Sequence, residues 1–130
     1  MKLFQMIYKF SRKIRGGSFL LRILYSCDIP KEAKIGKNVY FAHRGLGVVI
    51  NAGSIIGDNV SIQHHVTLAR GKNGCPIIHK NVKIGAYAFI MGNVEIHENT
   101  VIGAGTMVLQ DIDKPGIYVN QRNLKNLCED

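Results

Sequence analysis

Residues 84–108 of the chain read IGAYAFIMGNVEIHENTVIGAGTMV, and an aliphatic residue returns in this stretch at every sixth position. A period of six differs from the 3.6 of an α-helix and from the simple alternation of a β-strand. It is typical of a parallel β-helix, in which each hexad forms one flat side and three hexads form one coil. The small residues that follow the aliphatic ones permit tight corners.

The same period extends through most of the chain. Twelve apolar positions follow it in three blocks: Ile35 and Phe41; Ile50, Ile56, Ile62 and Leu68; Ile78, Ile84, Ile90, Ile96, Ile102 and Val108. A second inward position, four residues after an anchor, is small or apolar at Val39, Val60, Val66, Val82, Ala88 and Val94. The pattern predicts an all-β prism of about four coils over residues 28–113; an ordinary sandwich of alternating strands is the alternative.

Two insertions interrupt the period. Three extra residues fall within 43–47 and four within 69–76, and both segments are rich in glycine. Insertions at the corners of a solenoid cost little stability and often carry function. We therefore expect the functional site near these corners.

Charge is distributed unevenly in this chain of 130 residues, whose formal net charge is +8. Residues 1–26 contain no acidic residue and six cations: Lys2, Lys9, Arg12, Lys13, Arg15 and Arg22. Without that segment the prism is nearly balanced, and basic and aromatic residues are not interleaved, so we predict no nucleic-acid partner.

The segments outside the prism are predicted as a basic amphipathic helical leader over 1–27 and an irregular tail over 114–130. Phe4, Ile7, Tyr8, Phe10 and Ile14 are expected on one side of the leader, which Gly16 and Gly17 bend. This leader either caps the open first coil or lies peripherally on an anionic membrane surface.

The cysteines Cys27, Cys75 and Cys128 are far apart, odd in number and form no CxxC pair. This usage favours a reducing compartment. Since no cleavable signal or membrane-length span is evident, the predicted location is cytoplasmic, with the inner face of the cell membrane as a refinement.

The spacing of Asp28 and His43 is fifteen residues, close to one coil. A carboxylate within reach of an imidazole fixes its tautomer and stabilises the imidazolium that forms when it takes a proton. His43 is therefore a candidate general base at the first insertion, although an exposed bystander histidine would give the same spacing.

The chain resembles the serine acetyltransferases and their relatives that O-acetylate bacterial polysaccharides. The resemblance covers residues 28–113 and rests on five stretches in the same order and spacing: Asp28–Gly36 with His43 and Gly47–Ile50, Val60–Leu68, Gly71–Gly74, Ile84–Ala86 and Ile102–Gln110. It implies a left-handed parallel β-helix, an exception to the right-handed crossover rule. It also implies a homotrimer with acetyl-CoA in the groove between neighbouring prisms, His43 as the general base and Asp28 as its orienting carboxylate.

Residues that bind the acetyl-CoA donor and the acetyl acceptor are expected at corners of the prism. Small residues eighteen apart would line a track for the pantetheine arm, or form tight corners only: Gly85, Ala86, Gly103 and Ala104. Two cations could meet the nucleotide phosphates: Arg70 and Lys72. His64, His65 and Cys75 are expected at the acceptor site. Cys75 stands where the resemblance places a second active-site histidine, which makes serine a less favoured acceptor.

The predicted function is therefore acetyl-CoA-dependent O-acetylation of a bacterial surface polysaccharide or its sugar precursor. A serine O-acetyltransferase and a non-enzymatic β-helix scaffold are the alternatives. A zinc enzyme of the carbonic-anhydrase type is weighed because His79 and His97 are eighteen apart, but the His-x4-His spacing of that family is absent. We predict no metal cofactor.

Overall fold

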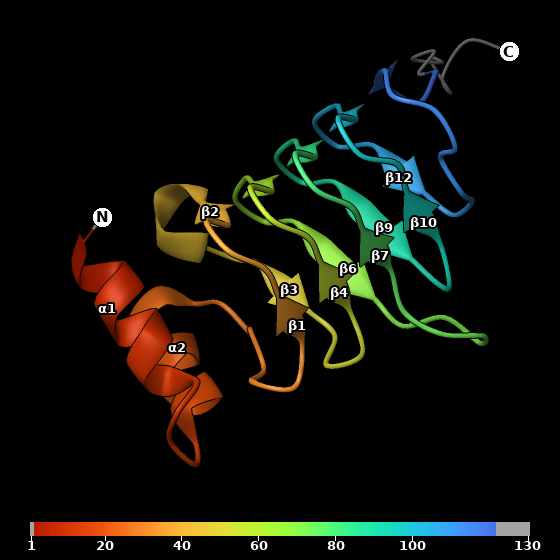
Figure 1. Ribbon diagram of the computed structural model, residues 1–130. Helices are drawn as coiled ribbons and strands as arrows, with labels where there is room; N and C mark the ends of the chain where they lie inside the picture. Colours follow the sequence, from red (N-terminus) through yellow and green to blue (C-terminus); the bar gives the residue numbers. More distant parts are fainter. Residues whose placement is uncertain (1, 122–130) are drawn as a thin grey trace, which may run out of the picture.

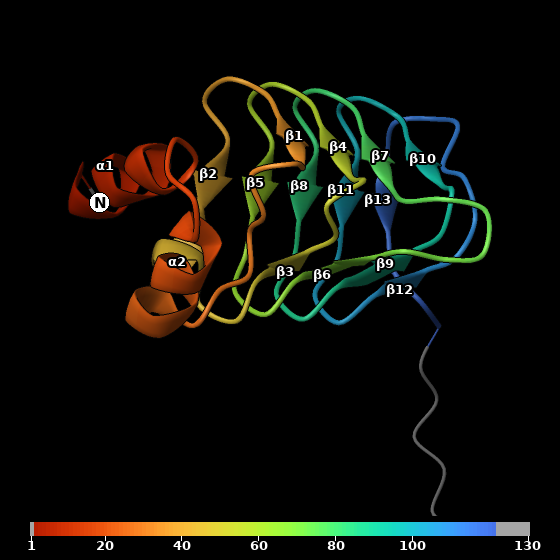
Figure 2. The same cartoon turned by 90° about the horizontal axis from the view of Figure 1, so that it is seen from below.

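The computed structural model describes residues 2–121, without the side chain of Lys2. Three parallel sheets form the sides of a prism of stacked coils, and two helices lie at its N-terminal end (Figures 1 and 2). Each strand is two or three residues long because each side of the prism is one hexad.

The sheets are named here by the order in which the chain enters them. The first sheet contains β1 (Lys34–Ile35), β4 (Ile55–Ile56), β7 (Ile77–Ile78) and β10 (Glu95–Ile96). The second contains β2 (Tyr40–Phe41), β5 (Ser61–Ile62), β8 (Lys83–Ile84), β11 (Val101–Ile102) and β13 (Ile117–Tyr118). The third contains β3 (Val49–Ile50), β6 (Thr67–Ala69), β9 (Phe89–Met91) and β12 (Met107–Val108).

The strand register follows the sequence period and its two insertions. Ile84 pairs with Ile102 at the basic spacing of eighteen residues. Phe41 pairs with Ile62 at twenty-one residues, and Ile62 pairs with Ile84 at twenty-two. The extra three and four residues are thus looped out at corners, while the aliphatic anchors stay in the buried column.

The core is a narrow stack of these anchors and of the second inward positions. Eleven of the twelve predicted anchors are buried, and Ile35 at the first coil is half-buried. At about 25 cal/mol per Å² of buried apolar surface, this column is the main favourable contribution to folding.

The helices α1 (Lys2–Ser11) and α2 (Gly17–Tyr25) contact the first coil. Phe4 and Tyr8 pack their rings on Phe41 at centroid distances of 6.2 and 5.6 Å. Phe10 was expected on this inward side but is exposed. The helical period explains the difference, since positions 4, 8 and 11 share one face and position 10 does not.

Arg12 directly follows α1 and fixes this end of the helix to the prism. Its guanidinium donates hydrogen bonds to the carbonyls of Pro30, Lys31 and Ala33 at 3.2, 2.9 and 2.7 Å. Within residues 2–121, no helix is long and apolar enough to cross a membrane.

The solenoid continues beyond the predicted end at Asp113. In β13, Ile117 and Tyr118 pair with Val101 and Ile102, although this segment lacks the six-residue period. Backbone pairing needs no aliphatic anchor, and the ring of Tyr118 packs against the core in its place. Residues 122–130 of the predicted tail, including Cys128, lie outside the described residues.

Candidate active site

The corner between the second and third sheets carries the candidate base. A four-residue turn at Ala42–Gly45 overlaps the first insertion, and this turn presents His43 and Arg44 to solvent. Both have left-handed backbones, with φ of 50° and 58°. Such a conformation costs a non-glycine residue roughly 1–2 kcal/mol, so the surrounding structure must hold it in place.

Three histidines and a tyrosine come together at this corner on successive coils. The ring of His64 meets His43 edge-on at a centroid distance of 5.0 Å, and it meets Tyr87 edge-on at 5.4 Å. His65 stacks flat on Tyr87 at 4.7 Å. We call these four residues the histidine corner.

Polar atoms of the histidine corner are left without partners. The Nδ1 atoms of His64 and His65 are buried and form no hydrogen bond within the described part of the protein. A buried polar atom without a partner is costly. The corner therefore offers unused hydrogen-bonding capacity directly beside the exposed imidazole of His43.

Gly47 makes room for this arrangement. A Cβ at Gly47 would lie 2.3 Å from Cδ2 of His65. Any side chain there would displace the imidazole from Tyr87. The glycine-rich insertion thus serves the packing of the histidine corner as well as the turn itself.

Asp28 lies beside β3 of the third sheet and is held there through its backbone. Its N–H donates to the carbonyl of Val48 at 2.8 Å, and its carbonyl accepts from the N–H of Ile50 at 2.9 Å. Its carboxylate pairs with Arg22 of α2. Among residues 2–121 no hydrogen bond joins Asp28 to His43, so its orienting role stays a prediction.

Small residues of the predicted donor track stack on the same side of the prism. The N–H of Gly85 donates to the carbonyl of Ile102, which precedes Gly103. A Cβ at Gly85 would lie 2.5 Å from the nitrogen of Ala104, and one at Gly103 would lie 2.5 Å from Cγ1 of Val119. Close packing therefore explains why glycine occupies both positions. A cofactor role stays a prediction for Gly85, Ala86, Gly103 and Ala104.

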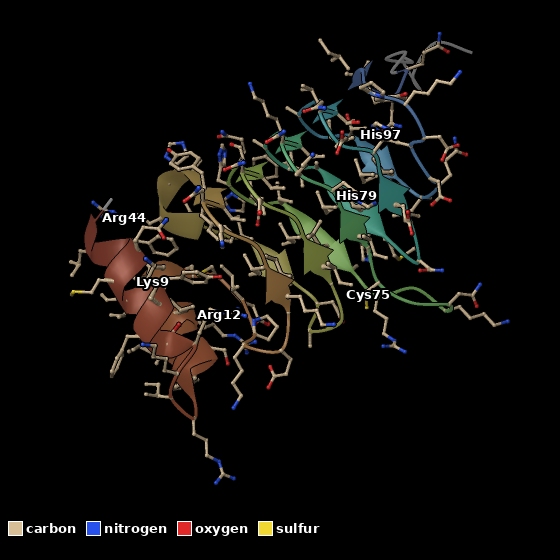
Figure 3. All side chains as sticks on the ribbon, in the orientation of Figure 1. Lys9, Arg12, Arg44, Cys75, His79 and His97 are labelled. Atoms are coloured by element: carbon tan, nitrogen blue, oxygen red, sulfur yellow. The ribbon has the colours of Figure 1, made fainter. Side chains whose placement is uncertain are left out.

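The long loop lies at another corner, between the third and first sheets. Arg70 and Lys72 are exposed there, and the loop closes through a backbone bridge between Gly71 and Gly74. Cys75 is buried, and its Sγ lies 3.2 Å from Oδ1 of Asn51. Within one chain, Cys75 (labelled in Figure 3) therefore does not join His64 and His65, because those histidines precede β6 and Cys75 follows it.

His79 and His97 occupy the third corner, on neighbouring coils as their spacing predicts (Figure 3). His79 approaches Glu95 at 3.5 Å, and Nδ1 of His97 lies 2.8 Å from the carbonyl oxygen of Glu98. No group of three metal-ligating side chains gathers among the described residues. This corner gives the zinc alternative no support.

Burial sets the chemistry of the first cysteine. Desolvation, and to a lesser extent the neighbouring Asp28 carboxylate, raises the pKa of the Cys27 thiol to about 11. The thiol is therefore neutral at physiological pH and unsuited to nucleophilic catalysis.

Two contacts at the site were missed by the sequence analysis. Tyr87 lies over His65 because the insertion of four residues raises the local spacing between coils to twenty-two. That arithmetic was available from the sequence. The pairing of Arg22 with Asp28 joins a helix to the prism, and no periodic pattern signals it.

Comparisons with known proteins agree with this architecture. Residues 75–110 match the family model described as bacterial transferase hexapeptide (six repeats). A serine acetyltransferase of Buchnera aphidicola subsp. Schizaphis graminum is 46% identical over 94 residues, which are 68% of this chain and 36% of the relative. Over residues 75–110 the repeats of this chain are therefore similar to those of the hexapeptide transferases.

Solved structures extend the likeness to the fold. The structure of serine acetyltransferase isoform 3 from Entamoeba histolytica in complex with cysteine has a TM-score of 0.83 at 26% identity, covering 98% of this chain and 50% of that one. Soybean serine acetyltransferase complexed with serine has a TM-score of 0.75 at 38% identity, covering 81% and 44%. The predicted left-handed parallel β-helix is confirmed. The chain spans half or less of the length of these three proteins.

Proposed function

We propose that the protein is an acetyl-CoA-dependent O-acetyltransferase whose acceptor is the hydroxyl of serine. The observation that carries this proposal is the 46% identity to a serine acetyltransferase over 94 residues. The exposed imidazole of His43, in a strained turn beside two further histidines, supports it from the geometry.

His43 acts as the general base in this proposal. Its imidazole takes the proton of the acceptor hydroxyl as the oxygen attacks the thioester carbonyl. The carbon–sulfur bond then breaks, and the imidazolium returns the proton to the departing CoA thiolate. An acetyl ester and free CoA result, and base assistance of this kind contributes about 10²–10⁴-fold.

The donor is proposed to lie along the side of the prism below His43. Ala86 is half-buried and Ala104 is exposed there, and their short side chains do not protrude from the prism. Backbone N–H groups near these corners are candidate hydrogen-bond donors to the thioester oxygen. Arg70 and Lys72 are exposed and are proposed to meet the nucleotide phosphates.

The sugar hydroxyl remains a second candidate acceptor for one reason. Cys75 is buried against Asn51 at the position where the family resemblance expects a histidine. A buried thiol offers a far weaker hydrogen bond than an imidazole. The relatives described above, however, are named for serine, so the polysaccharide prediction has less support than its serine alternative.

We further propose a homotrimer in the cytoplasm. The third sheet leaves apolar side chains more than a third exposed at Val49, Met91 and Met107, as a flat side that associates with another copy would. Cys27 and Cys75 are free thiols, in keeping with a reducing compartment.

The test is consumption of acetyl-CoA thioester by the purified full chain with L-serine, with a neutral oligosaccharide and with no acceptor. We expect serine to accelerate the loss of thioester, and His43→Asn to abolish that acceleration. His79→Asn, a histidine at another corner, is the matched control and should retain the rate. Acceleration by the oligosaccharide alone would reverse the choice of acceptor. No acceleration by either would favour the scaffold alternative.

A further inference from the structure

The two N-terminal helices expose more apolar surface than capping the prism requires. Phe4, Tyr8 and Leu21 are the buried residues that cover the first coil. Six further large apolar side chains of these helices are more than half exposed: Leu3, Met6, Phe10, Phe19, Ile23 and Leu24. An apolar patch of this kind on a folded domain marks an interaction surface.

Cations flank these apolar residues, and acidic groups are absent from the same segment. Lys9, Lys13 and Arg15 are exposed and form no ion pair with any residue in the described part of the chain. Arg12 and Arg22 are already engaged, by backbone carbonyls and by Asp28. The unengaged charge is therefore purely positive and lies on α1, at Lys9, and on the turn between α1 and α2, at Lys13 and Arg15.

This combination fits an anionic lipid bilayer better than a second copy of the chain. An isologous contact would bring the cationic face of one copy against the same face of another, and like charges would oppose it. A bilayer with acidic headgroups accepts the apolar side chains at the acyl boundary and attracts the cations. Both helices are far too short to span the membrane.

The position of the helices allows such docking without blocking the prism. Both views place α1 and α2 beyond the first coil, at the N-terminal end of the stack (Figures 1 and 2). The histidine corner begins on the first coil, beside these helices, and extends over the next two coils, while the third sheet extends along the prism. Arg12 ties α1 rigidly to the start of the first coil, so the helices and the prism form one unit.

We propose that the outward surface of α1 and α2 docks the protein peripherally on anionic lipid. This docking surface consists of the six exposed apolar residues together with Lys9, Lys13 and Arg15. The proposal goes beyond the acetyl-transfer reaction and does not depend on it, because none of these residues belongs to the histidine corner.

The test is flotation of the full chain with vesicles of phosphatidylcholine alone or mixed with phosphatidylglycerol. We expect binding to the mixed vesicles, little binding to phosphatidylcholine, and release at high salt. Lys9→Gln with Lys13→Gln should weaken binding by about tenfold or more, since each lysine near an acidic surface contributes measurably. Lys83→Gln with Lys114→Gln, exposed lysines of the later coils, should leave binding unchanged.

A second pair of variants tests the apolar part. Phe10→Gln with Ile23→Gln should reduce binding by about tenfold or more. Leu109→Gln with Ile117→Gln, which are at least as exposed and lie at the far end, should not. Circular dichroism checks that each variant is folded. Equal binding to both vesicle types, or no effect of Phe10→Gln with Ile23→Gln, would overturn the proposal. Self-association that this variant abolishes, without vesicle binding, would assign the surface to a second copy.

Discussion

Two corners of the prism both contain residues with left-handed backbones, but their side chains differ in kind and in hydrogen bonding. Between the first and second sheets, Asn38, Asn59, Asn81 and Asn99 stack on successive coils with φ between 55° and 60°. Their side-chain amides form a continuous ladder of hydrogen bonds of 3.1–3.3 Å. We call these four residues the asparagine corner. The histidine corner also contains left-handed residues, with φ of 50°, 56° and 60° at His43, His65 and Tyr87.

The difference lies in what the side chains do. Asparagine tolerates the left-handed region better than most residues, and each amide here satisfies its neighbour. At the histidine corner, bulky rings occupy the same backbone region and leave the Nδ1 atoms of His64 and His65 without partners. A corner built only for stability would not be made this way. Strain together with unsatisfied polar atoms is typical of functional sites.

The largest effect is expected when the histidine of one corner is replaced by the asparagine of the other. His43→Asn keeps a residue that accepts φ of 50° but removes the proposed base. We expect turnover with acetyl-CoA and the acceptor to fall at least about a hundredfold, the lower end of base assistance. Thermal unfolding should be little changed. A variant that retains near-normal turnover would remove His43 from the mechanism.

The asparagine corner is tested by Asn81→Ala. Alanine carries the left-handed penalty and ends the ladder, in which Asn81 accepts from Asn59 and donates to Asn99. We expect a loss of about 1–2 kcal/mol in the free energy of unfolding, measured with denaturant. Asn81→Gly relieves the strain but not the lost hydrogen bonds, so it should cost less. Turnover of acetyl-CoA should be the same in both variants, because this corner lies away from His43.

A smaller effect is expected from His64, whose ring meets His43 edge-on at 5.0 Å. We regard it as a positioning residue that limits rotation of the base. His64→Ala should lower kcat by about tenfold with little change in KM, as for an interaction that matters mainly in the transition state. His64→Phe restores the aromatic edge and should recover most of the loss. If both variants lose equally, the ring nitrogen rather than the packing is what His43 needs.

The sequence predicted the prism well because its core is periodic. Each anchor repeats a local rule, and the two insertions shift the register by their own lengths, as in the pairings of Phe41 with Ile62 and of Ile62 with Ile84. The column of His64, His65 and Tyr87 follows from the same arithmetic once the insertion is counted. Periodicity therefore carries information about every residue on a coil.

Where the period ends, the sequence carries less information about contacts. Phe10 is exposed because α1 can bury only one stripe against the first coil. The guanidinium of Arg22 in α2 pairs with the carboxylate of Asp28, a contact that no repeat encodes. The continuation at Ile117 and Tyr118 depends on backbone pairing, which is nearly independent of side-chain identity.

The smallest expected effect concerns Arg44 in the turn of the histidine corner. Arg44 is exposed, forms no ion pair among the described residues and has φ of 58°. If the histidine corner is strained, Arg44→Gly should raise the free energy of unfolding by about 0.5 kcal/mol, because glycine adopts this φ without steric cost. Arg44→Val should lower it by about 1–2 kcal/mol, since a β-branched residue at positive φ is a strong outlier.

Arg70→Gly is the matched control for this measurement. Arg70 is also an exposed arginine in a glycine-rich insertion, but it is not among the residues with positive φ. There the added entropy of the unfolded chain should dominate, so glycine should lower stability slightly. Strain at position 44 is therefore shown if Arg44→Gly raises the free energy of unfolding while Arg70→Gly lowers it. If Arg44→Gly and Arg70→Gly destabilise equally, the turn that presents His43 stores no strain, and the contrast with the asparagine corner then depends on the unsatisfied imidazole nitrogens alone.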